Sequence, residues 1–206
     1  MRPVVSSLLS CVNKRATNSW RLASGARHTG GALQLLFVCT GNICRSPIAE
    51  RLAGVYSTQS SIENVIVSSA GTHAVVGQPI HADAVRVLQR LGGDAAGFSA
   101  RQLTARIASS ADLIVTMTRA HRNSVLELAP SKLHRTFTLA EVAQLASTFD
   151  VDSLADLSSF RSHLVAAHVR DIPDPMGRGP DVFEEAGALI STLIPPVMTL
   201  CARSSN

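Results

Sequence analysis

The stretch Val38-Cys39-Thr40-Gly41-Asn42-Ile43-Cys44-Arg45-Ser46-Pro47 decides how this chain begins its fold and where its chemistry lies. The apolar run Leu33–Val38 leads into the stretch and is typical of a buried β-strand. Ser46 and Pro47 end it, and a serine N-cap followed by proline at the first helical position is a usual helix start. The stretch therefore predicts a strand, a tight loop over residues 39–45 and a helix.

The rest of the chain alternates between strand and helix signals in the same way. The pattern predicts strand 65–69, helix 79–91, strand 112–116, helix 119–128, strand 134–139, helix 141–146, a polar segment 147–170 of weak helical character, a loop 173–180 and helix 182–193. Such alternation favours a parallel sheet covered on both faces, here a three-layer α/β/α fold with a four-stranded sheet. Ligands bind at the carboxyl ends of strands in these folds, which is where Cys39 falls.

Size and composition exclude several classes of protein. A chain of 206 residues that is 46% hydrophobic suits one globular domain and is not intrinsically disordered as a whole. No stretch approaches about 18 uninterrupted apolar residues, so we expect no membrane span. Four cysteines do not make a disulfide scaffold.

The positive charge lies mainly at the N-terminus. Residues 1–33 hold five of the 19 basic residues and none of the 15 acidic ones, so the remainder is close to neutral. This balance predicts no nucleic-acid partner. We interpret 1–33 as a basic, disordered extension, with a targeting peptide or an interaction arm as alternatives, and 34–200 as the folded domain. No secretory signal is evident, so we expect a cytoplasmic protein.

The loop itself has the chemistry of a phosphate site. Backbone N–H groups that lead into a helix N-terminus form an anion nest, and Gly41 and Asn42 tolerate the left-handed backbone that such a nest needs. Arg45 can clamp two phosphate oxygens, and the same positive field favours a Cys39 thiolate that attacks phosphorus. Ser46 can donate a hydrogen bond to the departing sulfur. A Cys-x4-Cys metal half-site is the weaker alternative, because the other cysteines lie near the termini.

These residues resemble the active-site loop of the low-molecular-weight protein tyrosine phosphatases. Later blocks that support the resemblance, which covers about 34–196, are Ser69-Ala70-Gly71-Thr72, Ala100-Arg101-Gln102-Leu103 and Asp112–Met117. The resemblance, to an actinobacterial-type member, implies a flavodoxin-like or Rossmann-like fold and needs neither metal nor cofactor. It implies Cys39 as nucleophile and Arg45 as clamp. The residues implied to bind phosphate are Thr40, Gly41, Asn42, Ile43, Cys44 and Ser46.

A second family signature is the Asp-Pro step at Ile172-Pro173-Asp174-Pro175. The resemblance makes Asp174 the general acid that protonates the leaving oxygen, and then the base that activates water. Asp171 and Asp181 are the rival carboxylates, but neither precedes a proline. The implied substrates are phosphotyrosine proteins, with tyrosine kinases among the candidates.

Several positions depart from the family pattern. Met176 and Gly177 stand where tyrosine-specific members often carry aromatic residues, and the run His73–Val76 lacks them as well. Phe98 replaces a histidine that often braces the loop, so another group must hold Asn42.

Three alternatives to a tyrosine phosphatase follow from the same resemblance. A protein-arginine phosphatase is one, although Ile43 stands where those members tend to carry threonine. An arsenate reductase needs further cysteines near residues 95–110, where this chain has none, and an inactive phosphoprotein-binding module would not need an intact site. Cys44 either forms a reversible disulfide with Cys39, as the family implies, or shapes the loop.

Overall fold

The computed structural model describes residues 31–164 and 169–205. A four-stranded parallel sheet with the strand order β2-β1-β3-β4 forms its centre. The elements in chain order are β1 (Leu33–Cys39), α1 (Arg45–Gln59), β2 (Val65–Gly71), α2 (Ala82–Arg90), α3 (Ala105–Ser110), β3 (Leu113–Thr116), α4 (Arg119–Leu128), η1 (Pro130–Arg135), β4 (Thr136–Thr138), α5 (Leu139–Thr148), α6 (Leu157–Phe160), η2 (Arg161–His163) and α7 (Pro180–Ser205).

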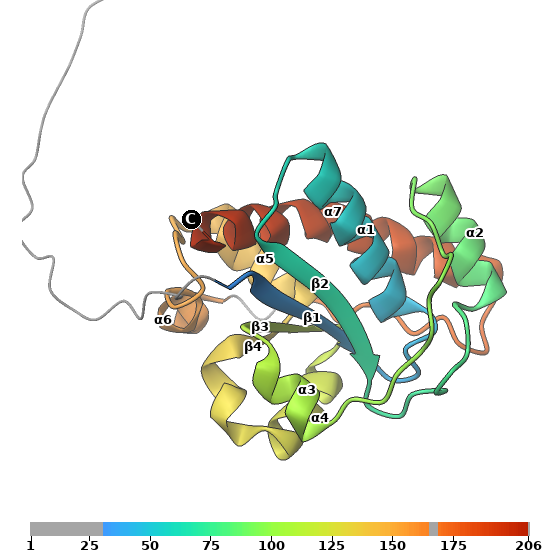
Figure 1. The fold of residues 1–206 in the computed structure, drawn as a ribbon, viewed down its shortest axis with the longest axis horizontal. Helices are drawn as coiled ribbons and strands as arrows, with labels where there is room; N and C mark the ends of the chain where they lie inside the picture. The colour runs from blue at the N-terminus through green and yellow to red at the C-terminus, as the bar shows by residue number, and fades with distance from the viewer. Residues whose placement is uncertain (1–30, 165–168, 206) are drawn as a thin grey trace, which may run out of the picture.

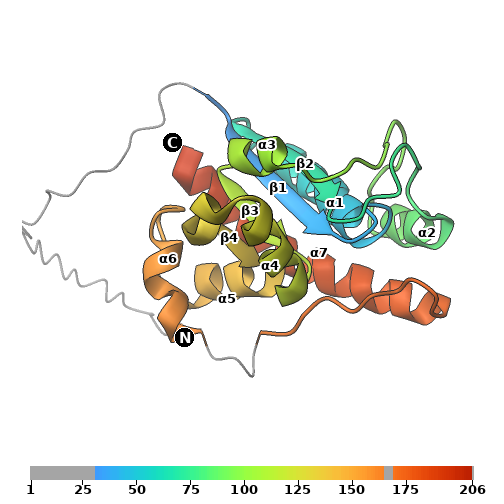
Figure 2. The ribbon, with the colours of Figure 1, turned by 90° about the horizontal axis from the view of Figure 1, so that it is seen from below.

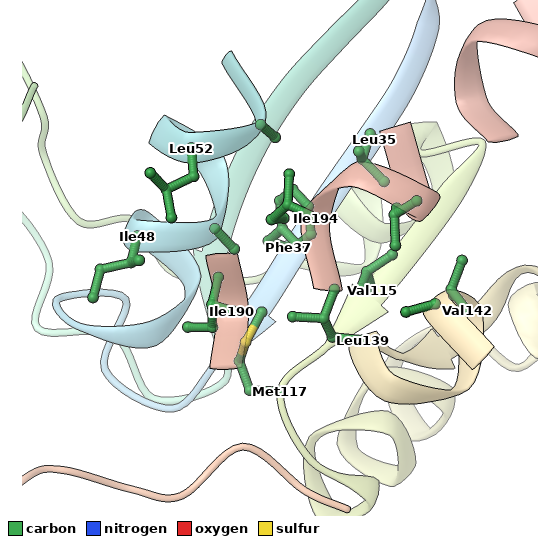
Figure 3. Packing of buried hydrophobic residues seen from close by; sticks show 14 of the residues in the cluster. Leu35, Phe37, Ile48, Leu52, Val115, Met117, Leu139, Val142, Ile190 and Ile194 are labelled. Carbon is green, nitrogen blue, oxygen red and sulfur yellow. The ribbon is translucent and has the colours of Figure 1, made fainter. Parts of the chain in front are cut away.

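Helices cover both faces of the sheet, which confirms the three-layer α/β/α prediction. Figure 1 shows α1 and α7 above the sheet and α3 and α4 below it. Side chains of β1 alternate between two cores, with Leu35 and Phe37 in the larger one and Leu36 and Val38 in the smaller one. The larger core also holds side chains of α1, α5 and α7, as Figure 3 shows around Phe37.

The sheet topology places the nucleophile loop at a switch point. From β1 the chain crosses to β2 on one side and later returns to β3 on the other. The loop after β1 therefore opens into the crevice where parallel sheets of this kind bind ligands. Figure 2 shows β1 between β2 and β3, with its arrowhead directed at the start of α1.

Helix α1 does not begin as the sequence predicted. It starts at Arg45 with Cys44 as N-cap, and no side chain caps it. Ser46 therefore lies in the first turn and is not the N-cap, because its hydroxyl is bonded instead to Cys39 and Asn42. Pro47 is tolerated there because the first-turn N–H groups have no intrahelical acceptor.

Other boundaries also shift for local reasons. The second predicted helix begins at Ala82, where the ring of His81 accepts from the Asp83 N–H. The fourth strand shrinks to Thr136–Thr138 because Thr138 enters a capping box with Glu141. Helix α3 was not predicted.

The ends of the folded region extend slightly beyond 34–200. Strand β1 begins at Leu33, which is buried, and α7 continues to Ser205. The prediction for residues 1–33 falls almost wholly outside the described residues.

Helix α7 is much longer than the predicted 182–193. It runs through Pro195 and Pro196, and Val197, Met198, Leu200 and Cys201 are buried beyond them. Among the described helices it alone is long and apolar enough to cross a membrane, but 44% of that window is buried within the fold. Helix α7 packs against α1 and α5, and its buried residues belong to the larger core.

Candidate active site

Cys39 ends the central strand β1, with its sulfur directed at the start of α1. Its Sγ lies 2.9 Å from Ser46 Oγ, and both residues are buried. Asn42 Nδ2 donates to the same Ser46 oxygen at 3.0 Å, which leaves the Ser46 proton available to the sulfur. A hydroxyl donor and a helix N-terminus therefore both lie beside the sulfur.

The carbonyl groups of the loop are held from outside by the segment that follows β2. Backbone N–H groups of residues 72, 73, 75 and 81 donate to the carbonyls of residues 39, 40, 41 and 43 at 2.8–3.0 Å. Across the described residues, no protein acceptor is bonded to the N–H groups of residues 41–44. With its carbonyls turned outward, the loop presents these N–H groups to an anion.

Asn42 is the brace of the loop. It has a left-handed backbone with φ of 54° and is fully buried. Its Nδ2 donates to Ser69 Oγ at 2.8 Å as well as to Ser46, and its Oδ1 accepts from the Arg101 N–H at 2.8 Å. Ser69 Oγ in turn donates to Glu50 Oε2 at 2.5 Å. Ser46, Ser69 and the Arg101 N–H thus hold Asn42, and Glu50 supports Ser69.

The left-handed backbone that the loop was expected to need is found at Asn42 and not at Gly41, which could also tolerate it. Gly41 does not have a positive φ, because Asn42 alone makes the reversal in the loop. Gly71, at the end of β2, is the glycine that the loop requires. A Cβ there would lie 2.4 Å from the Thr40 carbonyl oxygen and 3.0 Å from the Asn42 nitrogen.

Arg45 connects the loop to the segment that carries Asp174. The guanidinium group is buried, its Nη1 donates to the Ile172 carbonyl at 3.2 Å, and its Nη2 lies 2.7 Å from Asp174 Oδ2. The Asp174 side chain is 49% exposed, and its Oδ1 accepts from the Met176 N–H at 3.1 Å. The structure therefore brings the three predicted catalytic residues together from two parts of the chain, the loop between β1 and α1 and the segment before α7.

A pocket of about 230 Å³ lies over the loop. Its lining residues are Cys39, Thr40, Gly41, Ile43, Cys44, Arg45, His73, Val75, Asp174 and Met176. Asn42 and Ser46 do not line the pocket, and their buried side chains hold the loop and the sulfur. Their contact with phosphate through the backbone stays a prediction. The lining contains no tyrosine, tryptophan or phenylalanine, as the sequence led us to expect.

Cys44 differs from Cys39 in its surroundings. Burial, followed by the nearby Cys39, raises the pKa of the Cys44 thiol to about 12. Its Sγ lies 3.3 Å from Met176 Sδ, and both loop cysteines are free thiols. A protonated, packed thiol suits a residue that shapes the loop, and the disulfide with Cys39 stays a prediction.

Two further residues, Glu50 and His121, support the site and were not predicted from the sequence. His121 Nε2 lies 2.8 Å from Thr40 Oγ1, and burial followed by the charge of Arg45 lowers the pKa of the imidazole to about 4. The sequence did contain a signal for His121. It lies three residues after Thr118, the N-cap of α4, and close to the carboxyl end of β3, where ligands bind in such sheets. Nothing local marks Glu50, whose partner Ser69 is on β2.

Comparisons with known proteins agree with this geometry. The family model for low molecular weight phosphotyrosine protein phosphatase matches residues 34–156. The chain is 31% identical over 156 residues to the low molecular weight protein-tyrosine-phosphatase Etp of Escherichia coli K12, covering 76% of this chain and 86% of that protein. It is 38% identical over 118 residues to the probable phosphatase EpsP of Ralstonia solanacearum, covering 57% of this chain and 75% of that protein.

Solved structures give the same result. A low molecular weight protein tyrosine phosphatase from T. tengcongensis aligns with a TM-score of 0.65 at 27% identity, covering 82% of this chain and 99% of that one. The YwlE arginine phosphatase from Geobacillus stearothermophilus aligns with a TM-score of 0.62 at 30% identity, covering 81% and 91%. The chain described here belongs to the low molecular weight phosphotyrosine protein phosphatase family.

Proposed function

We propose that this protein hydrolyses phosphotyrosine in proteins through a phosphocysteine intermediate on Cys39. The observation that carries the proposal is the convergence of Cys39, Arg45 and Asp174 on one pocket, above a loop whose N–H groups face inward. We further propose that tyrosine kinases are among the substrates.

In the first step the Cys39 thiolate attacks phosphorus and an S–P bond forms. The bond from phosphorus to the tyrosine oxygen breaks, and Asp174 donates a proton to that oxygen. The three remaining phosphoryl oxygens accept hydrogen bonds from the loop N–H groups and from Arg45, and these donors balance the charge on the oxygens.

In the second step water attacks the phosphocysteine. Asp174, now ionised, accepts a proton from the water while the S–P bond breaks and phosphate leaves. Ser46 Oγ, 2.9 Å from the sulfur, stabilises the thiolate as it departs by donating its proton to a hydrogen bond. The same carboxyl group therefore serves as acid and then as base.

The ion pair between Arg45 and Asp174 links substrate binding to proton donation. Phosphate oxygens compete with the Asp174 carboxylate for Arg45 Nη2. A carboxylate that loses its cationic partner and gains a dianionic neighbour favours its protonated form, which is the form a general acid needs.

A phosphoarginine substrate is the second candidate. It is supported by the likeness to a structure named as an arginine phosphatase and by the aliphatic walls of Ile43, Val75 and Met176, which offer no ring to stack on a tyrosine. Against it, Ile43 lacks the hydroxyl expected in such members. An arsenate reductase is less well supported, because the described cysteine outside the loop, Cys201, is buried in α7.

The test compares two cysteine variants with p-nitrophenyl phosphate as substrate. Cys39→Ser is expected to lower turnover by at least about four orders of magnitude, since a serine hydroxyl is a much weaker nucleophile here. Cys201→Ser is the matched control, with the same change far from the pocket, and should retain turnover. Hydrolysis by Cys39→Ser at the rate of the control would contradict the proposal.

A peptide panel then decides between the two substrates. Phosphotyrosine, phosphoserine and phosphoarginine peptides of one sequence are compared by kcat/KM. We expect phosphotyrosine to be preferred, and a preference for phosphoarginine would replace the substrate while leaving the role of Cys39 intact.

A further inference from the structure

His121 occupies a position between two parts of the active site. It lies in the first turn of α4 and is only 7% exposed. Its Nδ1 lies 2.9 Å from the hydroxyl of Thr118, the N-cap of α4, and its Nε2 lies 2.8 Å from the hydroxyl of Thr40. Thr40 directly follows the nucleophile and lines the pocket. The imidazole thus spans from a helix cap to the nucleophile loop.

The same turn of chain also holds the segment that carries Asp174. The Met117 carbonyl accepts from the Ile172 N–H at 2.9 Å, and the Arg119 N–H donates to Asp171 Oδ1 at 3.0 Å. The Met117 N–H donates to the Val38 carbonyl at 2.9 Å, which fixes the turn to the central strand. Residues 117–121 therefore contact the nucleophile loop on one side and the acid segment on the other.

The chemistry of the imidazole suits a fixed spacer. Burial and the neighbouring Arg45 lower the pKa of His121 to about 4, against the opposing effect of Asp174 and Asp171, so the ring is neutral at pH 7. A neutral ring donates from one nitrogen and accepts at the other, and both Thr40 and Thr118 carry hydroxyls that can serve either role. The rigid ring then sets the separation between the two threonines.

We propose that His121 is a positioning residue for the phosphatase reaction, which holds Thr40 and hence the Cys39 end of the loop in register with the Asp174 segment. The inference rests on the proposed function, because it concerns the rate of that reaction. His121 acts through Thr40 and touches neither the sulfur nor Asp174 in the contacts described.

The test uses two substitutions of His121 whose side-chain amides extend to different distances from the backbone. His121→Asn places its amide near the position of Nδ1 and can bond Thr118 but not Thr40, whereas His121→Gln extends about as far as Nε2. With p-nitrophenyl phosphate we expect His121→Asn to lower kcat about tenfold to a hundredfold, as small misplacements of reacting groups do. His121→Gln should recover much of that loss.

A double-variant cycle separates positioning from general destabilisation. Thr40→Val removes the same hydrogen bond from the loop side and should lower kcat by a similar factor. If the two residues act as a unit, Thr40→Val combined with His121→Asn is no slower than the slower single variant. Melting temperatures are measured for the same variants. We expect the size of the loss of kcat to be unrelated to the size of the loss of stability from one variant to the next.

Distinct results would overturn this inference and the proposed function. An inactive wild-type protein contradicts the proposed function itself. An active wild type with unchanged kcat in His121→Asn, or losses that multiply in the double variant, contradicts only the role of His121. If His121→Asn does not fold, the test rests on Thr40→Val. A kcat equal to that of wild type in Thr40→Val then contradicts the positioning role of His121.

Discussion

The loop that carries Cys39 and the segment that carries Asp174 meet in one pocket but are held in different ways. In the loop, four carbonyls of residues 39–43 accept hydrogen bonds from the segment that follows β2. The fully buried Asn42 side chain also bonds to Ser69 and to the Arg101 N–H. The Asp174 side chain is half exposed, and its bonds are to Arg45 and to the Met176 N–H two residues away.

This difference matches what each group has to do. The nucleophile and the phosphate cradle must be organised before substrate binds, because any reorganisation during the reaction would raise its barrier. The acid must exchange protons with the leaving group and with water, which requires access to solvent. We therefore expect changes in the loop to impair binding, turnover and stability together, and changes at Asp174 to impair turnover almost alone.

Among the substitutions that test this contrast, the largest expected effect is at Asp174. Asp174→Asn should lower kcat about 10²–10⁴-fold on phenyl phosphate, because an amide cannot donate the proton that this poor leaving group needs. The loss should be smaller on p-nitrophenyl phosphate, whose leaving group needs less protonation. Inorganic phosphate should inhibit the variant at least as tightly as wild type, because the carboxylate that competes for Arg45 is gone. Steady-state kinetics on both substrates measure this. Asp181→Asn is the control and should keep its turnover. An Asp174→Asn protein as active as wild type would remove Asp174 from its role.

A change in the loop brace should act more broadly. Asn42→Gly keeps the left-handed backbone accessible but removes the bonds to Ser46, Ser69 and Arg101. We expect kcat to fall about tenfold or more, phosphate inhibition to weaken, and stability to fall by about 2 kcal/mol, since buried partners lose their bonds. Kinetics and urea unfolding measure the three effects. A loss of kcat with normal phosphate inhibition would contradict the contrast between the two regions.

Gly71 tests the packing behind the loop. In Gly71→Ala the new methyl group meets the Thr40 carbonyl, so the loop must shift or the protein loses about 1–3 kcal/mol of stability. The control is Gly54→Ala in α1, where a Cβ meets nothing within 4 Å and alanine favours the helix. Thermal unfolding of the two variants should move in opposite directions. A Gly71→Ala protein as stable and active as wild type would show that the close approach is not needed.

The smallest expected effect is a pH dependence of stability at His121. An unfolded chain protonates this side chain near pH 6.5, whereas the folded protein does so only near pH 4. The unfolded state therefore holds more protons in that window, and the free energy of unfolding falls as the pH falls through it. Urea titrations should show a steeper fall for wild type than for His121→Gln. Parallel curves would mean that His121 titrates alike in both states.

Local sequence patterns were sufficient to predict the parallel sheet and most of the helices around it. The apolar runs predicted β1, β2 and β3. The polar and proline signals placed Cys39 and Arg45 at the two ends of a tight loop and Asp174 in a second loop. Patterns failed where tertiary contacts outweigh local preference. Ser46 does not cap α1 because Cys39 and Asn42 bind its hydroxyl, and α7 continues past Pro195 because the residues that follow are buried.

The residues that hold the active site in place were harder to predict than the residues that react. Thr40 and His121 are 81 positions apart, and Glu50 meets Ser69 across two elements, so no short motif contains either pair. The departure at Phe98 indicated that a substitute brace was needed. Which residues supply it depends on the packing of α1 against β2, and the sequence does not show that packing.

Trapping the intermediate tests the central claim most directly. In Asp174→Asn, p-nitrophenyl phosphate can still phosphorylate the nucleophile, while the loss of the base slows its release. Acid quenching followed by peptide mass spectrometry should find a phosphoryl group on Cys39, and the same experiment in the Cys39→Ser background should find none on a cysteine. A phosphoryl group on Cys44, or turnover without any on Cys39, would contradict the account.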